Sequence, residues 1–115
     1  MKGGNDLCRG TTNWEDVYII KEELIPNDVL NNLNKGWVKN HGGIPVDLCI
    51  GEEVENLILK GISTLGSCCG HNEYQSHVLI HRDEVNKVID LGYKVQEYRW
   101  ELYEVYLRSG TQINT

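Results

Sequence analysis

Residues 46–71, VDLCIGEEVENLILKGISTLGSCCGH, contain the pattern that decides the fold. Apolar residues recur there at helical spacing, namely Ile50, Val54, Leu57 and Ile58. Asp47 stands where a helix N-cap is expected, and Gly61 suits the left-handed conformation that commonly ends a helix. The pattern therefore predicts a helix over residues 48–60, with Glu52 and Glu53 as favourable anions in its first turns.

The segment after Gly61 predicts a strand that runs back along this helix. Residues 62–68 are short and β-favouring, and they lead directly into two adjacent cysteines. A helix of this length rises about 20 Å and a seven-residue strand spans about 23 Å, so the strand ends where the helix begins. We therefore expect Cys49 to lie close in space to Cys68, Cys69 and His71.

The N-terminal segments predict a strand, a short helix and a loop. Residues 17–20 are β-branched and aromatic, which favours a strand that continues toward residue 25. Val29, Leu30 and Leu33 then recur at helical spacing and predict a short helix up to Gly36. Residues 39–45 contain glycine, asparagine and proline, and this composition indicates a loop.

The C-terminal segments predict strands around a second helix. Residues 77–81 form an apolar-centred strand, which starts at the cysteine end so that His77 could join the group there. Asp83 is expected to cap a helix that ends at Gly92, with an apolar face made by Val85, Val88 and Ile89. Residues 93–107 favour two strands or one bent strand, although a helix also fits their pattern.

These elements predict one α+β domain over residues 14–115, a small mixed or antiparallel sheet packed by two or three helices. Residues 1–13 are expected to be a loose leader. The formal net charge of -6 and the absence of a basic stripe argue against extended nucleic acid as a partner. No apolar segment is long enough for a membrane helix or a signal peptide, so we expect a cytoplasmic protein with reduced cysteines.

The cysteines and histidine allow three interpretations. Zinc prefers thiolate and imidazole ligands, so Cys49, Cys68, Cys69 and His71 are candidate ligands of a zinc ion. Successive side chains of a strand point to opposite faces, so one of the two adjacent cysteines is expected in the core. All three cysteines could instead be core residues, or Cys49 or Cys69 could be a reactive thiol. The sequence leaves these alternatives open.

Two groups of residues are candidates for ligand binding. Gly70 could be a turn glycine or could leave room for a ligand to approach the backbone, beside His71 and Asn72. The stretch 98–103, YRWELY, contains residue types that are enriched in binding hot spots, with Arg99 and Trp100 as candidates. This stretch could be a stacking platform, an oligomer interface or ordinary sheet.

Residues 46–96 resemble a group of small phage and prophage proteins of Gram-positive bacteria. The shared pattern runs roughly D-x-C-I, an acidic helix, K-G-I-x-T-x-G-S-C-C-G-H-N, a strand, and a helix that ends L-G-Y. The resemblance implies a phage-related origin and adds weight to the cysteine and histidine group, namely Cys49, Cys68, Cys69, Gly70 and His71. The first 45 residues and the aromatic C-terminal stretch lie outside the pattern.

By analogy with small accessory phage proteins, we expect an anti-defence protein that acts by non-enzymatic binding in the host cytoplasm. It would block a host protein or sequester a nucleotide-derived immune signal, and its aromatic C-terminal stretch favours a homo-oligomer. One alternative is a small zinc- or thiol-dependent enzyme acting on a nucleotide-like substrate, and another is a zinc-stabilised interaction module. Without a recognisable catalytic set the sequence favours binding, although Arg82, Arg99 or Arg108 could hold a small anion.

Overall fold

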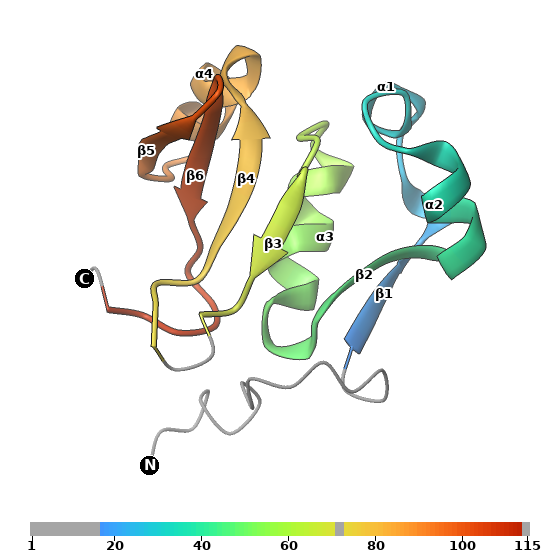
Figure 1. The fold of residues 1–115 in the computed structure, drawn as a ribbon, viewed down its shortest axis with the longest axis horizontal. Coiled ribbons are helices and arrows are strands. Elements are labelled where there is room, and N and C mark those ends of the chain that lie inside the picture. The colour runs from blue at the N-terminus through green and yellow to red at the C-terminus, as the bar shows by residue number, and fades with distance from the viewer. Residues whose placement is uncertain (1–16, 71–72, 114–115) are drawn as a thin grey trace.

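The computed structural model describes residues 17–70 and 73–113, which form the predicted α+β fold (Figure 1). Its helices are α1 (Asn27–Leu30), α2 (Lys35–His41), α3 (Gly51–Leu59) and α4 (Val85–Asp90). Its strands are β1 (Val17–Lys21), β2 (Gly43–Asp47), β3 (Gly66–Cys68), β4 (His77–His81), β5 (Val95–Arg99) and β6 (Leu102–Tyr106). The predicted leader, residues 1–13, lies outside the described residues.

The described strands form two antiparallel sheets, where the sequence predicted one. β1 pairs with β2, and the larger sheet has the order β3-β4-β6-β5. In Figure 1 the helices α3 and α4 lie behind the larger sheet, and α1 and α2 lie together beside the β1–β2 pair. Val78 of β4 and its cross-strand partner Val105 of β6 are fully buried in the core that α3 covers.

The predicted central helix is confirmed as α3, which follows a 3-10 turn over Leu48–Ile50. Gly61 ends it with a positive φ of 92°, as expected of a left-handed cap. Asp47 precedes the 3-10 turn, but its side chain does not cap it. Instead its carboxylate accepts a hydrogen bond of 3.0 Å from the backbone N–H of Cys69. This contact confirms that the chain doubles back, because it joins the start of the helical segment to the end of β3.

The N-terminal predictions need three corrections. The first strand ends at Lys21, where a 3-10 turn over Glu22–Leu24 replaces the predicted extension. The helix predicted up to Gly36 ends early, as α1, and a separate helix, α2, begins at Lys35, where the Asn34 side chain caps it by accepting from the N–H of Trp37 at 3.0 Å. The predicted loop at 39–45 is instead the end of α2 followed by β2, since pairing with β1 outweighs the local glycine and proline signal.

The C-terminal predictions are mostly confirmed. Gly92 ends the second helix with a positive φ of 94°. The predicted cap at Asp83 is wrong, because His81 occupies that position and its ring nitrogen accepts from the N–H of Asp83 at 3.2 Å. Val88 is fully buried, but Ile89 is 50 % exposed and is not part of the packed face. Every helix in the described part of the chain is too short or too polar to span a bilayer.

Residues 93–107 form the antiparallel hairpin of β5 and β6, so the prediction of two strands is confirmed and the helical alternative is wrong. The turn between them contains only Trp100 and Glu101. Both residues have positive φ angles, 52° and 66°, which a two-residue hairpin turn of this hand requires.

Candidate functional site

The two adjacent cysteines point to different environments, as the strand geometry predicted. Cys69 is 2 % exposed and belongs to the hydrophobic core. Cys68 is half-buried on the other face, where it is the direct cross-strand partner of His77. Its sulfur accepts a hydrogen bond of 3.4 Å from the N–H of Gly70. This arrangement confirms that His77 begins β4 at the cysteine end, and it favours packing as the role of Cys69.

The zinc site stays a prediction. Within residues 17–70 and 73–113, no three His, Cys, Asp or Glu side chains are close enough together to hold a metal ion. His71 and Asn72 lie outside the described residues, and Cys49 lies in the 3-10 turn that precedes α3, partly buried against the core. Metal analysis of protein purified without a metal-affinity tag tests the site, because about one zinc per chain is expected if all four ligands bind one ion.

Gly70 is required for packing. Its φ of 89° is one that residues with side chains rarely adopt. A Cβ atom at this position would stand 2.1 Å from the carbonyl oxygen of Tyr74 and 2.8 Å from the side chain of Thr111. The turn interpretation of Gly70 therefore suffices for this residue, and its role as a ligand-binding position stays a prediction.

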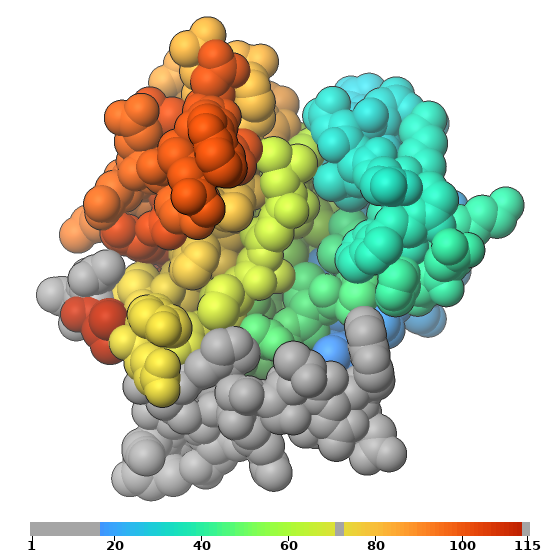
Figure 2. Space-filling view, in the orientation of Figure 1, coloured from blue at the N-terminus to red at the C-terminus, as the bar shows by residue number. Residues whose placement is uncertain are grey.

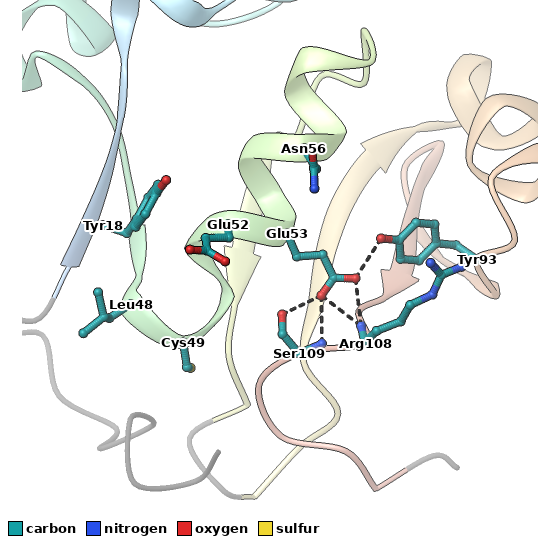
Figure 3. A pocket seen from close by; sticks show the side chains of 9 residues that line it. All are labelled: Tyr18, Leu48, Cys49, Glu52, Glu53, Asn56, Tyr93, Arg108 and Ser109. Atoms are coloured by element: carbon teal, nitrogen blue, oxygen red, sulfur yellow. Dashed lines mark hydrogen bonds between the residues drawn. The ribbon is translucent and has the colours of Figure 1, made fainter. Parts of the chain in front are cut away.

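A cleft of about 670 Å³, which we call the α3 cleft, lies beside the first half of α3 (Figure 3). Glu53 points from α3 across one side of this cleft, toward the segment that follows β6. Glu52 points to the other side, toward Tyr18 of β1. The lining residues are Tyr18, Leu48, Cys49, Glu52, Glu53, Asn56, Tyr93, Arg108 and Ser109.

Glu53 is the centre of a dense hydrogen-bond network with Tyr93, Arg108 and Ser109, which we call the Glu53 network. Its carboxylate accepts from the backbone N–H groups of Arg108 and Ser109 at 2.9 and 2.8 Å. It also accepts from the hydroxyl groups of Ser109 and Tyr93 at 2.5 and 2.7 Å. The Arg108 guanidinium lies 4.2 Å from the centre of the Tyr93 ring. These contacts hold the segment that follows β6 against α3.

The network changes the acidity of its members. Burial alone would raise the pKa of Glu53, but the hydrogen bonds from Ser109, Arg108 and Tyr93 outweigh it and hold the pKa below its ordinary value of 4.5. Burial, and then the hydrogen bond to Glu53, raise the pKa of the Tyr93 hydroxyl above its ordinary value of 10.0. Because the oxygens of Glu53 are already engaged by these donors, the carboxylate serves to hold structure and is a poor general base.

The lowered pKa of Glu53 predicts acid sensitivity. A carboxyl group whose pKa is lower in the folded state than in the unfolded state stabilises the fold above its unfolded pKa. We therefore expect this contribution to be lost as the pH falls below 4.5, through the folded-state pKa. Urea unfolding between about pH 6 and pH 3 should show a smaller stability difference between wild type and Glu53→Gln as the pH falls. A constant difference across this range would contradict the assignment.

The tip of the β5–β6 hairpin, residues 98–101, carries the most exposed aromatic side chain of the described structure. Trp100 is 78 % exposed. The Arg99 guanidinium lies 4.4 Å from the centre of the Trp100 ring and 4.9 Å from that of the Tyr98 ring. Figure 2 shows the orange hairpin at the surface, packed against the amber segment before it and across the molecule from the cyan α1 and α2. The hairpin tip therefore offers two aromatic rings and a guanidinium together at the surface.

The conformation of the hairpin tip is locally unfavourable. Two-residue turns of this type prefer Asn-Gly or Asp-Gly, whereas a side chain as large as Trp in the left-handed region is uncommon. Such a residue costs on the order of 1 kcal/mol. The backbone is held by the hydrogen bond from the N–H of Arg82 to the carbonyl of Glu101, 2.8 Å long, and by His81, whose ring nitrogen lies 3.4 Å from the Glu101 carboxylate. The fold thus maintains a strained turn that exposes Trp100.

Sequence reasoning selected Arg99 and Trp100 but missed the Glu53 network. Glu52 and Glu53 were interpreted alike, as anions in the first turns of a helix, and nothing local distinguishes them. Only the tertiary contact to Arg108 and Ser109, 55 and 56 residues away, gives Glu53 its role. Comparisons with protein-family models, curated proteins and solved structures gave no match for this chain.

Proposed function

We propose that this chain is a non-enzymatic binding protein that recognises another protein through its hairpin tip. The observation that carries the proposal is the exposure of Trp100 on a turn whose conformation disfavours it. Local strain that the surrounding structure maintains is characteristic of functional positions. Trp, Tyr and Arg are also the residues that contribute most often to binding hot spots, and the hairpin tip contains one of each.

We further propose that the target is a host protein and that the chain is a phage-encoded anti-defence protein of the host cytoplasm. The similarity of residues 46–96 to phage and prophage proteins supports this origin. The formal net charge of -6 favours a protein partner over a phosphate-rich one. The partner would be blocked by occupation of its surface, which requires no reaction.

The α3 cleft supports sequestration of a nucleotide-derived signal less well. Glu52 and Glu53 line it, and two carboxylates repel phosphate groups. Its one lining guanidinium, that of Arg108, stacks on Tyr93 and donates to the carbonyl of Leu91 at 3.1 Å. A nucleotide released from the purified protein on denaturation would contradict the proposal and would support sequestration.

Capture of host proteins by matched variants tests the proposal. Wild type, Trp100→Asn and Trp37→Gln would be immobilised and exposed to host extract, and the bound proteins would be quantified by mass spectrometry. Trp37 is a suitable control, because it is 44 % exposed and lies on α2, away from the hairpin. We expect one host protein bound in stoichiometric amounts by wild type and Trp37→Gln but lost from Trp100→Asn. Equal capture by all three would contradict the proposal.

Trp100→Asn should leave stability nearly unchanged while it abolishes binding. Asparagine tolerates the left-handed region, so the substitution relieves about 1 kcal/mol of strain and loses about 0.5 kcal/mol of exposed cation–π contact. Chemical denaturation should therefore give a free energy of unfolding equal to wild type or slightly higher. A loss of about 2 kcal/mol or more would mean that Trp100 is a structural residue.

Self-association through the hairpin tip is the alternative to recognition of a host protein, because both contacts would need the exposed Trp100 ring. Exposed aromatic patches favour contact with an apolar surface, which a second copy of the chain also offers. Native mass spectrometry of wild type and Trp100→Asn tests this expectation, since a dimer formed by the hairpin tip is lost in the variant. A dimer that persists in Trp100→Asn would place the interface elsewhere.

A further inference from the structure

We infer that the hairpin tip recognises a carboxylate of its partner protein, with Arg99 paired to an Asp or Glu side chain and Trp100 filling an adjoining apolar pocket. This inference rests on the proposed function and adds the chemistry of the partner. It is carried by the state of the Arg99 guanidinium, which lies against two aromatic rings and forms no ion pair with any residue that the structure describes.

Arg99 differs from two other arginines of the described structure in how its donors are used. The guanidinium of Arg82 lies 3.9 Å from the carboxylate of Glu101. That of Arg108 donates to a backbone carbonyl. Arg99 contacts the rings of Tyr98 and Trp100, but it makes no ion pair or hydrogen bond through its side chain with any residue of 17–70 and 73–113. Its planar set of N–H donors is therefore available to a partner.

The ring contacts orient the Arg99 guanidinium so that it can bind both oxygens of a carboxylate. Rings that lie against a guanidinium hold it in place and leave its N–H groups, which lie in the guanidinium plane, to form hydrogen bonds. A guanidinium that is already oriented loses less side-chain freedom when it binds, and its fork matches the two oxygens of a carboxylate. The exposed Trp100 ring beside it favours a partner with an apolar pocket next to that carboxylate.

The charges around Arg99 favour a carboxylate over a phosphate. Glu97 and Glu101 are both exposed, one on the strand that leads to the hairpin tip and one within it. Their negative charges repel a doubly charged phosphate more strongly than a singly charged carboxylate. One guanidinium is also too few cations for a phosphate chain, which is bound by clusters of Lys and Arg. The predicted epitope is therefore an acidic residue beside a large apolar one.

Selection from a random linear peptide library tests this inference. Full-length wild type and Trp100→Asn would be used as baits, and peptides enriched on wild type alone would be sequenced. We expect these peptides to share an Asp or Glu next to a large apolar residue. Failure to enrich any Trp100-dependent peptide, or enrichment of peptides without an acid, would overturn the inference.

Synthetic peptides from the selection then test the role of Arg99. We expect Arg99→Lys, which keeps the charge but loses the fork, to weaken binding about tenfold in fluorescence anisotropy. Changing the peptide's acid to its amide should weaken binding to wild type about tenfold and should have little further effect on Arg99→Gln. Equal binding by wild type and Arg99→Lys, or tighter binding of a phosphoserine peptide, would overturn the carboxylate assignment.

The outcomes distinguish this inference from the proposed function. If capture of the host protein depends on Trp100 while Arg99→Lys and Arg99→Gln capture it as well as wild type does, only the carboxylate inference fails. If capture is unaffected by Trp100→Asn, the proposed function fails, and the inference that depends on it fails as well.

Discussion

Replacing Glu53 by glutamine is expected to lower the free energy of unfolding by about 3 kcal/mol. The carboxylate accepts hydrogen bonds from Tyr93, Arg108 and Ser109, so an amide would place an N–H group against other donors. Donors left without an acceptor in a partly buried site lose the hydration they had in the unfolded chain. Urea denaturation at neutral pH, with unfolding monitored by tryptophan fluorescence, would measure the effect.

The neighbouring residue provides a matched control. Glu52 has the same charge and lies next to Glu53 in the first turn of α3. It is exposed, however, and points away from the Glu53 network (Figure 3). We expect Glu52→Gln to change the free energy of unfolding by less than about 0.5 kcal/mol. Similar effects of the two substitutions would mean that Glu53 stabilises the fold through the helix dipole and not through the hydrogen bonds of the network.

Replacing Gly43 by alanine is expected to lower the free energy of unfolding by about 3 kcal/mol or more. Gly43 is paired with Lys21 at the end of the β1–β2 sheet and has a φ of 146°. A Cβ atom there would stand 2.0 Å from the carbonyl oxygen of Ile20, which is backbone and cannot rotate away. The strand pairing would have to open to relieve this clash, which thermal or chemical denaturation would detect.

The preceding residue, Gly42, provides a control that separates the steric clash at Gly43 from the cost of a side chain at positive φ. Gly42 also has a positive φ, 72°, but a Cβ atom there would meet no described atom within 4 Å. We expect Gly42→Ala to cost only about 1 kcal/mol, the usual penalty for a side chain in the left-handed region. If Gly42→Ala were as destabilising as Gly43→Ala, the close approach of β1 to Gly43 would not be the cause.

The sequence predicts those parts of the fold whose signal is local. Helix α3 and its end at Gly61 follow from the spacing of apolar residues and from the left-handed preference of glycine, and neither depends on distant contacts. Strands β1 and β4 follow similarly from β-branched runs. The meeting of residue 47 with residue 69 was also predictable, because it requires only the lengths of a helix and a strand.

Other parts depend on contacts that no local pattern shows. β2 contains Gly43 and Pro45, which indicate a loop, yet pairing with β1 makes it a strand. The hydrogen bonds between β1 and β2 therefore outweigh the local preference of these residues for a loop. Glu53 shows the same principle for a site, because its role depends on hydrogen bonds from residues 108 and 109, which are distant from it in the sequence.

The hairpin tip lies between these two cases. Its composition singled out Arg99 and Trp100, but their arrangement could not be predicted, because Trp-Glu is not a typical sequence for a two-residue turn. Where a sequence contradicts local preference, a functional cause is the usual explanation. The departure from the expected turn sequence is thus itself an argument for recognition at this position.

Site-specific photocrosslinking tests the central claim, that Trp100 contacts the partner, most directly. A photoreactive aromatic amino acid would replace Trp100 in one variant and Trp37 in another, and each would be irradiated in host cells. The account predicts a covalent adduct with a single host protein from position 100 and none from position 37. An adduct formed from position 37 alone, or with equal yield from both positions, would contradict it.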